Sequence, residues 1–371
     1  MKIVLIHKAQ FYKRPPVINS TLILSDLGHD VTLITEGLNT YWEEELKRRN
    51  IKVCVIQNRF IKYGTLGKVL AYRNFKQEAF KIIEQEKKEH TSVLVWVEGA
   101  YTIVALGKKL NEYKHILQIQ ELHEESKMQL NAISKVINSA EAVFMPEYNR
   151  AAIYRVWFKL DKMPYLLPNK PDIVCKKEDM QLLTEKYRKQ LEQLEGKKVI
   201  IYQGFLGKDR DLTPFVQAVK ELGGDFRLAV MGEYRQSIDL YKKIDPQLIH
   251  IDYTPAPEHL AYTAKCYIGI LSYNPHILNN AFCAPNKIFE YAKFKIPVLC
   301  NELPGLKWLL DSNKAGLAVD ITNVKEIKKA IIEIDNNYEE YSKNAERLYN
   351  SVNNKETIHN VLSRIENSSI L

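Results

Sequence analysis

The sequence predicts an α/β protein made of two doubly wound domains, each with a parallel sheet between layers of helices. Short apolar runs alternate with longer amphipathic stretches in the first half, and the same alternation restarts near residue 199. This alternation is typical of strand–helix–strand units in parallel sheets. The length of 371 residues exceeds the usual size of one domain and also favours two.

The first domain is expected over residues 1–168. Apolar runs predict its strands at residues 2–7, 31–35, 51–56, 93–97, 115–120 and 142–145. Amphipathic patterns predict helices at residues 17–28, around 71–88 and at 127–139. A proline-punctuated segment at residues 166–172 then predicts a connector to the second domain.

The second domain is expected over residues 169–345, followed by a C-terminal helix at 346–371 that packs back toward the first domain. Helices are predicted at residues 176–198, 213–222, 257–265 and directly after Ala284. Strands are predicted at residues 199–202, 227–231, 249–252, 267–271, 298–300 and 318–320. Ligands bind at the carboxyl ends of such strands, so a cleft between two facing sheets is the expected site.

Composition narrows the class of protein. With 46% hydrophobic and 26% charged residues, the chain has the composition of a soluble globular protein. Its five cysteines show no metal-type spacing, which favours reduced thiols in a cytoplasm. No apolar run approaches the roughly 20 residues that span a bilayer. We therefore expect a cytoplasmic protein, either free or at the inner face of the cell membrane.

The formal charge of +8 fits either an anionic partner or a lysine-rich solvated surface. No nucleic-acid-binding motif occurs, so nucleic acid is not an expected partner. The first loop, residues 7–16, has no G-x-G-x-x-G, which argues against a dinucleotide-dependent oxidoreductase. A P-loop and a G-x-S-x-G nucleophile elbow are also missing from the sequence.

The segment at residues 284–300 carries the most chemical information. Asn286, Lys287 and Glu290 fall within the first turns of a predicted helix. A helix N-terminus has free N–H groups and a partial positive charge, which suit an anion such as a diphosphate. A carboxylate one turn further along can accept hydrogen bonds from ribose hydroxyls. Together these features indicate a nucleotide sugar.

Other loops at strand ends hold further candidates for the donor site. Gly204 and Arg210 follow the strand at 199–202, Gly232 follows the strand at 227–231, and Tyr253 follows the strand at 249–252. Glycines let the backbone approach a ligand, and Lys or Arg pairs with phosphate oxygens. Ordinary turns with solvated cations would explain the same residues. In the first domain, His123 lies in the turn after the strand at 115–120, flanked by Glu121 and Glu124, and is either incidental or functional.

The order of these features resembles the glycosyltransferases of the GT-B fold, family 4 type, also called glycosyl transferases group 1. Gly204 with Arg210, residues 168–171, and residues 285–292 followed by Pro297 are similar to that family's motifs. Glu290 matches the second glutamate of the family's E-x7-E pattern, whose first position here is Phe282. The resemblance covers essentially the whole chain and implies two Rossmann-like domains that face a central cleft.

The resemblance implies transfer of a sugar from a nucleotide sugar to a glycan or lipid-linked acceptor, with retention, in the synthesis of a bacterial surface polysaccharide such as capsule, O-antigen or exopolysaccharide. The implied catalytic residues are His123, Arg210, Lys287 and Glu290. The implied donor-binding residues are Gly204, Arg210, Gly232, Tyr253, Asn286, Lys287 and Glu290. Neither a metal nor a cofactor is expected.

Two alternatives remain open at this point. A catalytically silent nucleotide-sugar-binding protein of the same fold would fit Phe282 and also Phe205, which stands where the family often has arginine. A GT-B-like epimerase is the second alternative. The acceptor is expected on the first domain, where residues 60–73 mix cations with apolar side chains. That segment suits either peripheral contact with a membrane or an ordinary surface helix.

Overall fold

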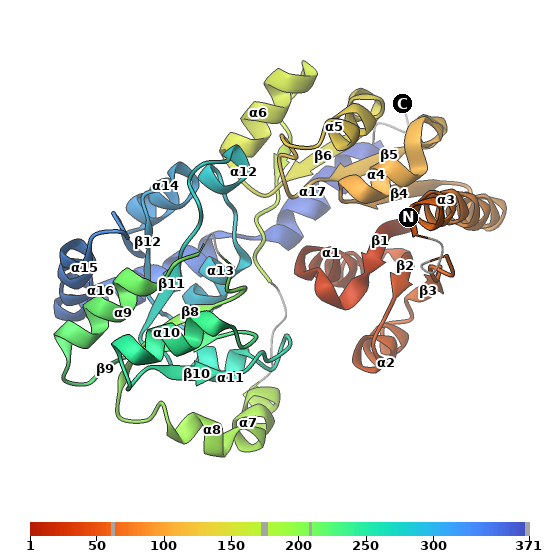
Figure 1. The fold of residues 1–371 in the computed structure, drawn as a ribbon. Helices are drawn as coiled ribbons and strands as arrows, with labels where there is room; N and C mark the ends of the chain where they lie inside the picture. Colours follow the sequence, from red (N-terminus) through yellow and green to blue (C-terminus); the bar gives the residue numbers. More distant parts are fainter. Residues whose placement is uncertain (61–63, 172–176, 208–209, 368–371) are drawn as a thin grey trace. The chain divides into compact units, whose positions relative to one another are not determined.

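The computed structural model, described for residues 1–60, 64–171, 177–207 and 210–367, divides into two compact units. Unit 1 comprises Met1–Asn169 and Asn353–Leu371, and unit 2 comprises Lys170–Val352. Both are built of parallel strands and helices, which confirms the predicted fold class (Figure 1). The C-terminal region is two helices, because the helix α16 (Tyr338–Ser351) ends before α17 (Asn354–Asn367) begins. Of these two helices, α16 belongs to unit 2 and α17 belongs to unit 1.

Unit 1 contains a sheet whose order is β3-β2-β1-β4-β5-β6-β7 within the described residues, with every neighbouring pair parallel. Its strands are β1 (Lys2–Gln10), β2 (Asp30–Gly37), β3 (Lys52–Val55), β4 (Val93–Glu98), β5 (His115–Gln118), β6 (Ala142–Met145) and β7 (Tyr165–Leu166). Its helices are α1 (Pro15–Asp26), α2 (Thr40–Arg48), α3 (Gly64–Glu89), α4 (Ala100–Leu106), α5 (Lys127–Ser134), α6 (Tyr148–Phe158) and α17.

Unit 2 contains a second parallel sheet, with the order β10-β9-β8-β11-β12-β13 in the described part of the chain. Its strands are β8 (Lys198–Gln203), β9 (Phe226–Met231), β10 (Ile249–Ile251), β11 (Ile268–Leu271), β12 (Val298–Asn301) and β13 (Gly316–Val319). Its helices are α7 (Lys177–Lys186), α8 (Arg188–Glu192), α9 (Thr213–Leu222), α10 (Gln236–Ile244), α11 (Leu260–Thr263), α12 (Leu278–Ala281), α13 (Asn286–Lys293), α14 (Pro304–Asn313), α15 (Val324–Asn336) and α16.

Two helix predictions in unit 2 were too long. The helix expected at 176–198 is split at Tyr187 into α7 and α8, and it ends before Gly196, whose φ of +66° is incompatible with a right-handed helix. The helix expected at 257–265 is reduced to α11. The residues before it form successive three-residue turns, in which Leu260 N donates to Pro257 O. The amphipathic pattern was correct in both places, but local turns shortened the helices.

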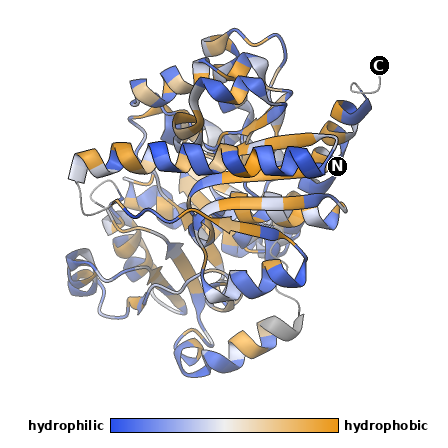
Figure 2. Ribbon diagram, turned by 90° about the vertical axis from the view of Figure 1, so that its right-hand side faces the viewer, coloured by the Kyte–Doolittle hydropathy of each residue, from blue (hydrophilic) through white to orange (hydrophobic). Residues whose placement is uncertain are grey.

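The strands form the core of each unit. Figure 2 shows them mainly in the hydrophobic colour, whereas the helices carry both colours. In β1 the side chains of Ile3, Val4, Leu5 and Ile6 are all fully buried, as expected for a strand covered on both faces. Among the described residues, no helix is long and apolar enough to cross a membrane.

In each sheet, the strand order reverses direction at one place. In unit 1 the chain proceeds outward from β1 to β2 and β3, then returns to β4 on the other side of β1. In unit 2 it proceeds from β8 to β9 and β10, then returns to β11 on the other side of β8. Loops diverge at such a switch point and leave a crevice at the carboxyl ends of the strands. Each unit therefore has one preferred edge for a ligand.

Candidate functional site

In unit 2, the loops after β8 and β9 meet through two glycines. Gly204 follows β8 with a φ of +148°, and its N–H donates to Met231 O over 3.0 Å. A Cβ atom at Gly232 would lie 2.5 Å from the carbonyl oxygen of Gly204. The structure thus brings these two predicted residues together. Gly232 is needed for this close backbone packing, independently of any ligand.

Arg210 is held at the switch point by aromatic rings. Its guanidinium carbon lies 4.6 Å from the ring centroid of Tyr273, which follows β11. Its Nη1 donates to Tyr202 Oη over 3.4 Å, and Tyr202 Oη in turn donates to Phe205 O over 2.9 Å. Sequence reasoning singled out Arg210 but missed the ring beneath it, because Tyr273 lies in the loop after β11, 63 positions further along the chain.

Asn301, at the end of β12, fixes Tyr273. Its Nδ2 donates to Tyr273 O over 2.7 Å, and its Oδ1 accepts from Tyr273 N over 3.3 Å. Because the side chain of Asn301 satisfies both backbone groups, the loop after β11 is anchored to β12. The aromatic platform under Arg210 is therefore preorganised rather than dependent on a ligand.

Glu290 is the centre of a charged cluster on α13. The residue is buried, and its Oε2 lies 3.3 Å from Lys287 Nζ and 3.1 Å from His259 Nε2. Burial alone would raise the pKa of Glu290, but the charge of Lys287 and the hydrogen bond from His259 outweigh it and hold this pKa well below its usual value. Glu290 is thus a stable carboxylate. Among the described residues, its Oε1 has no hydrogen-bond partner.

His259 is a cluster member that sequence reasoning missed. Its Nδ1 is buried and has no hydrogen-bond partner within the described part of the chain. Its carbonyl accepts from Thr263 Oγ1 over 3.2 Å, and Thr263 Oγ1 accepts from Gln203 Nε2 over 2.6 Å. Gln203 directly precedes Gly204, so this chain of bonds links the Glu290 cluster to the end of β8. No local motif marks His259, because the contact joins residues 31 positions apart.

The position of α13 on the sheet follows from Tyr291. This ring is fully buried, and its Oη lies 3.3 Å from Ile201 O and 3.4 Å from Ile270 O. A Cβ atom at Gly269 would come within 2.4 Å of the same ring. The glycine in β11 therefore lets the helix approach the sheet closely, and this approach delivers Glu290 and Lys287 to the strand edge.

The remaining predicted donor residues are Asn286 and Tyr253. Asn286 is half-buried and begins α13, whose N-cap Pro285 offers no side-chain cap. The first N–H groups of α13 are thus available to an anion. Tyr253 is 67% exposed after β10. Phe205 is 60% exposed, and the guanidinium of Arg235 lies 5.2 Å from its ring centroid. Lys208 lies in the same loop as Arg210, and its type of side chain could also pair with phosphate oxygens, but it falls outside the described residues.

In unit 1, His123 lies in the loop after β5 with a left-handed φ of 61°. Arg150 Nη1 donates to Gln120 O, and Tyr154 Oη donates to Glu121 O over 3.0 Å. Both donors lie on α6, so this helix holds the loop in place. Burial lowers the pKa of His123, and the nearby carboxylate of Glu121 partly opposes this. The imidazole is therefore neutral near pH 7. His123 belongs to unit 1, whereas the other predicted site residues belong to unit 2.

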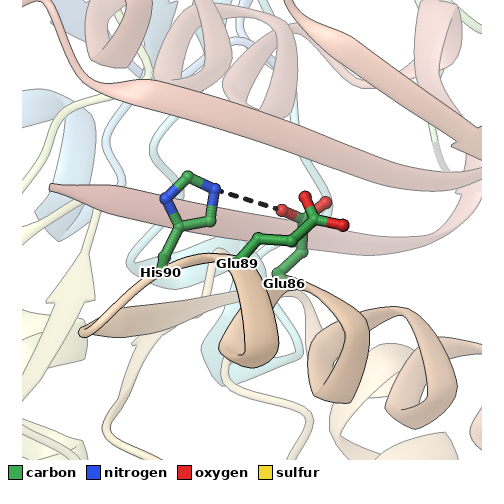
Figure 3. A group of neighbouring side chains, drawn as sticks. All are labelled: Glu86, Glu89 and His90. Carbon is green, nitrogen blue, oxygen red and sulfur yellow. Dashed lines mark ion pairs between the residues drawn. The ribbon is translucent and has the colours of Figure 1, made fainter.

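The amino edge of the first sheet carries an acidic group whose geometry also suits a metal. Glu86, Glu89 and His90 lie near one another at the end of α3 (Figure 3). The buried Glu86 is already paired with Lys52 at 2.8 Å and with Lys2 at 3.2 Å. Two ammonium groups neutralise this carboxylate and occupy its oxygens. We interpret the group as a structural ion-pair network that ties α3 to the sheet.

Comparison with known proteins identifies the class. Residues 184–351 match the family model described as glycosyl transferases group 1. HepE from Anabaena, solved with UDP-glucose, is 12% identical, with a TM-score of 0.72 over 99% of this chain and 100% of that one. Sucrose-phosphate synthase from Thermosynechococcus elongatus is 14% identical, with a TM-score of 0.71 over 100% and 99% of the two chains.

A third solved structure is WaaG, a glycosyltransferase involved in lipopolysaccharide biosynthesis, which is 12% identical with a TM-score of 0.61 over 97% of this chain and 98% of that one. No curated protein sequence matched the chain. The fold is therefore GT-B, as the sequence resemblance implied. The family match lies over most of unit 2, and together with the fold it supports a glycosyltransferase.

Proposed function

We propose that this glycosyltransferase moves a sugar from a nucleotide-sugar donor to a glycan or lipid-linked acceptor, in the synthesis of a bacterial surface polysaccharide. The observation that carries the proposal is the buried Glu290 cluster beside the uncapped N-terminus of α13. A neutral ligand would not need both an anion-binding helix end and a fixed cation. The relatives add support, since HepE was solved with UDP-glucose and WaaG takes part in lipopolysaccharide synthesis.

The donor would be bound both through its diphosphate and through its nucleoside. The diphosphate would accept hydrogen bonds from the first N–H groups of α13 and pair with Arg210 and Lys287. The ribose hydroxyls would donate to Glu290 Oε1, which lies on a stable carboxylate and has no partner among the described residues. The exposed ring of Tyr253 would lie near the base, and Gly204 would allow close approach of the backbone.

Catalysis would depend on stabilising the charge of the leaving group. As the glycosidic bond to the diphosphate breaks, negative charge grows on the phosphate oxygens, and Arg210 with Lys287 would stabilise it without a metal or a cofactor. One preorganised contact of this kind contributes about 3 kcal/mol, or roughly a hundredfold in rate. In line with the family resemblance, we extend the proposal to retention of the anomeric configuration, with neutral His123 orienting the transferred sugar or the acceptor.

The test is binding and hydrolysis of UDP-, GDP- and CDP-sugars by purified protein. We expect a thermal shift with one nucleotide series, slow hydrolysis of the matching sugar donor, and no loss of either in EDTA. Arg210→Ala should lower kcat by about a hundredfold. Arg227→Ala is the matched control, because its guanidinium bonds to backbone carbonyls near the amino end of β9.

Three outcomes would contradict the proposal. Unchanged donor affinity and turnover in both Arg210→Ala and Glu290→Ala would refute the assigned site. Donor binding without hydrolysis or transfer would favour a silent binding protein. Conversion of the donor sugar to its epimer would favour an epimerase.

A further inference from the structure

The first sheet has its own ligand edge, at which two buried side chains have unused hydrogen-bonding atoms. His7 in β1 and Glu98 in β4 are register partners in neighbouring parallel strands, directly at the switch point of unit 1. Their residues are only 7% and 3% exposed. His7 Nε2 and Glu98 Oε2 have no hydrogen-bond partner within the described residues. Buried polar atoms are normally paired, so two orphans at a ligand edge need an explanation.

A backbone carbonyl next to His7 determines which of its ring nitrogens carries the proton. Its Nδ1 lies 3.5 Å from the carbonyl oxygen of Glu98, which can only accept a hydrogen bond. Nδ1 therefore carries the proton, and Nε2 presents a lone pair. Burial lowers the pKa of His7 to about 4, which keeps the ring neutral near pH 7. His7 is thus a hydrogen-bond acceptor at this edge.

Glu98 supplies the complementary group. Burial raises the pKa of its carboxyl well above the ordinary value, and the nearby positive charge of Arg14 only partly opposes this. A neutral carboxyl has an O–H that can donate. The backbone of Glu98 is fixed, because its carbonyl accepts from Thr102 Oγ1 over 2.6 Å. Gln120, two residues beyond β5, adds a third buried atom, Oε1, that has no partner among the described residues.

An acceptor lone pair next to an O–H donor matches a group that both donates and accepts, which is a hydroxyl. We infer that Glu98 and His7 bind a sugar hydroxyl in unit 1, with Glu98 donating to the hydroxyl oxygen and His7 Nε2 accepting its proton. The inference deepens the proposed glycosyl transfer and rests on it for the class of ligand. The hydroxyl belongs either to the acceptor or to the sugar that is transferred.

Saturation-transfer NMR on the full chain tests the site, with free glucose and UDP-glucose as probes. In Glu98→Leu and His7→Leu, we expect sugar-proton signals to fall at least about tenfold, because each change removes one hydrogen bond to the ligand. Glu98→Gln keeps a donor and His7→Gln keeps an acceptor, so both should retain most of the signal. Loss with free glucose identifies the acceptor, and loss only with UDP-glucose identifies the transferred sugar.

Stability separates this role from a structural one. Removing an unsatisfied buried group should leave Tm unchanged or raise it, so Glu98→Leu should bind less sugar without unfolding earlier. His90→Gln, at the opposite edge of the same sheet, is the control and should leave the sugar signals unchanged. Unchanged sugar signals in folded Glu98→Leu and His7→Leu would overturn the inference. Nucleoside signals from UDP-, GDP- and CDP-glucose report the nucleotide site separately, so their absence in the wild type with all three donors would refute the proposed donor site instead.

Discussion

At the scale of single residues, unit 2 combines a buried carboxylate with two basic partners. Glu290 remains ionised because Lys287 and His259 both contact its Oε2. The three groups stabilise one another, so removing one of them leaves a buried charge without its partner, which destabilises the fold. The same arrangement leaves one carboxylate oxygen to a ligand. Stability and the proposed donor binding would therefore be coupled at this position.

We expect Glu290→Gln to lower the free energy of unfolding by about 1–3 kcal/mol near pH 7. The pKa of Glu290 is lower in the folded chain than its ordinary value of 4.5. A depressed pKa gives stability that is present above the unfolded value and is lost as pH falls below it. The difference between wild type and Glu290→Gln should therefore shrink below about pH 4.5. Urea unfolding at pH 7, 5 and 3.5 measures this, and a gap that widens at pH 3.5 would contradict it.

At the scale of elements, α13 depends on one small residue in the strand beneath it. Gly269 leaves room for the ring of Tyr291, and the ring sets how closely the helix approaches β8 and β11. Protein interiors are close-packed, so an added methyl group cannot be absorbed without movement of the ring. The helix and its charged residues would have to shift with it.

Gly269→Ala should therefore destabilise the chain by about 1–3 kcal/mol. It should also weaken donor binding, because the displaced helix carries Lys287 and Glu290. Thermal unfolding with and without the donor measures both effects. Tyr291→Leu creates space for the added methyl group, so the double variant should lose less stability than the sum of the single changes. Additive losses would show that the ring and the glycine do not interact.

At the scale of the whole molecule, the net charge and the exposed side chains bear on whether the protein contacts a membrane. The chain has a formal charge of +8. Helix α3 exposes Leu66 and Val69, whose exposed fractions are 65% and 62%. Further along the same helix lies an open cavity of about 590 Å³, which is lined by Arg73, Lys76, Lys81, Lys109 and other residues. Apolar side chains next to cations suit the surface of an anionic bilayer.

We expect the protein to co-sediment with vesicles that contain anionic phospholipid and not with purely neutral ones, and to be released by high salt, because electrostatic attraction is screened. Leu66→Ser with Val69→Ser should weaken binding severalfold. Tyr148→Ser is the matched control, since Tyr148 is 55% exposed at the start of α6. Equal binding to neutral and anionic vesicles would contradict an electrostatic contact.

Sequence reasoning could assign the candidate donor residues to loops after particular strands, because parallel sheets collect ligands at one edge and the residues of each loop are contiguous. Gly204, Arg210, Lys287 and Glu290 were proposed in this way. The partners that hold them could not. Tyr273 reaches Arg210 and His259 reaches Glu290 only through long-range packing.

The sequence by itself determined the alternation of strands and helices, the two sheets and the charged start of α13, since these depend on local periodicity and spacing. Only the tertiary structure decided which side chains meet and which buried atoms stay unpaired. The orphaned Nε2 of His7 and Oε2 of Glu98 illustrate this. Their chemistry arises because two strands 91 positions apart in the chain lie in register, which brings both side chains to one edge and removes them from water.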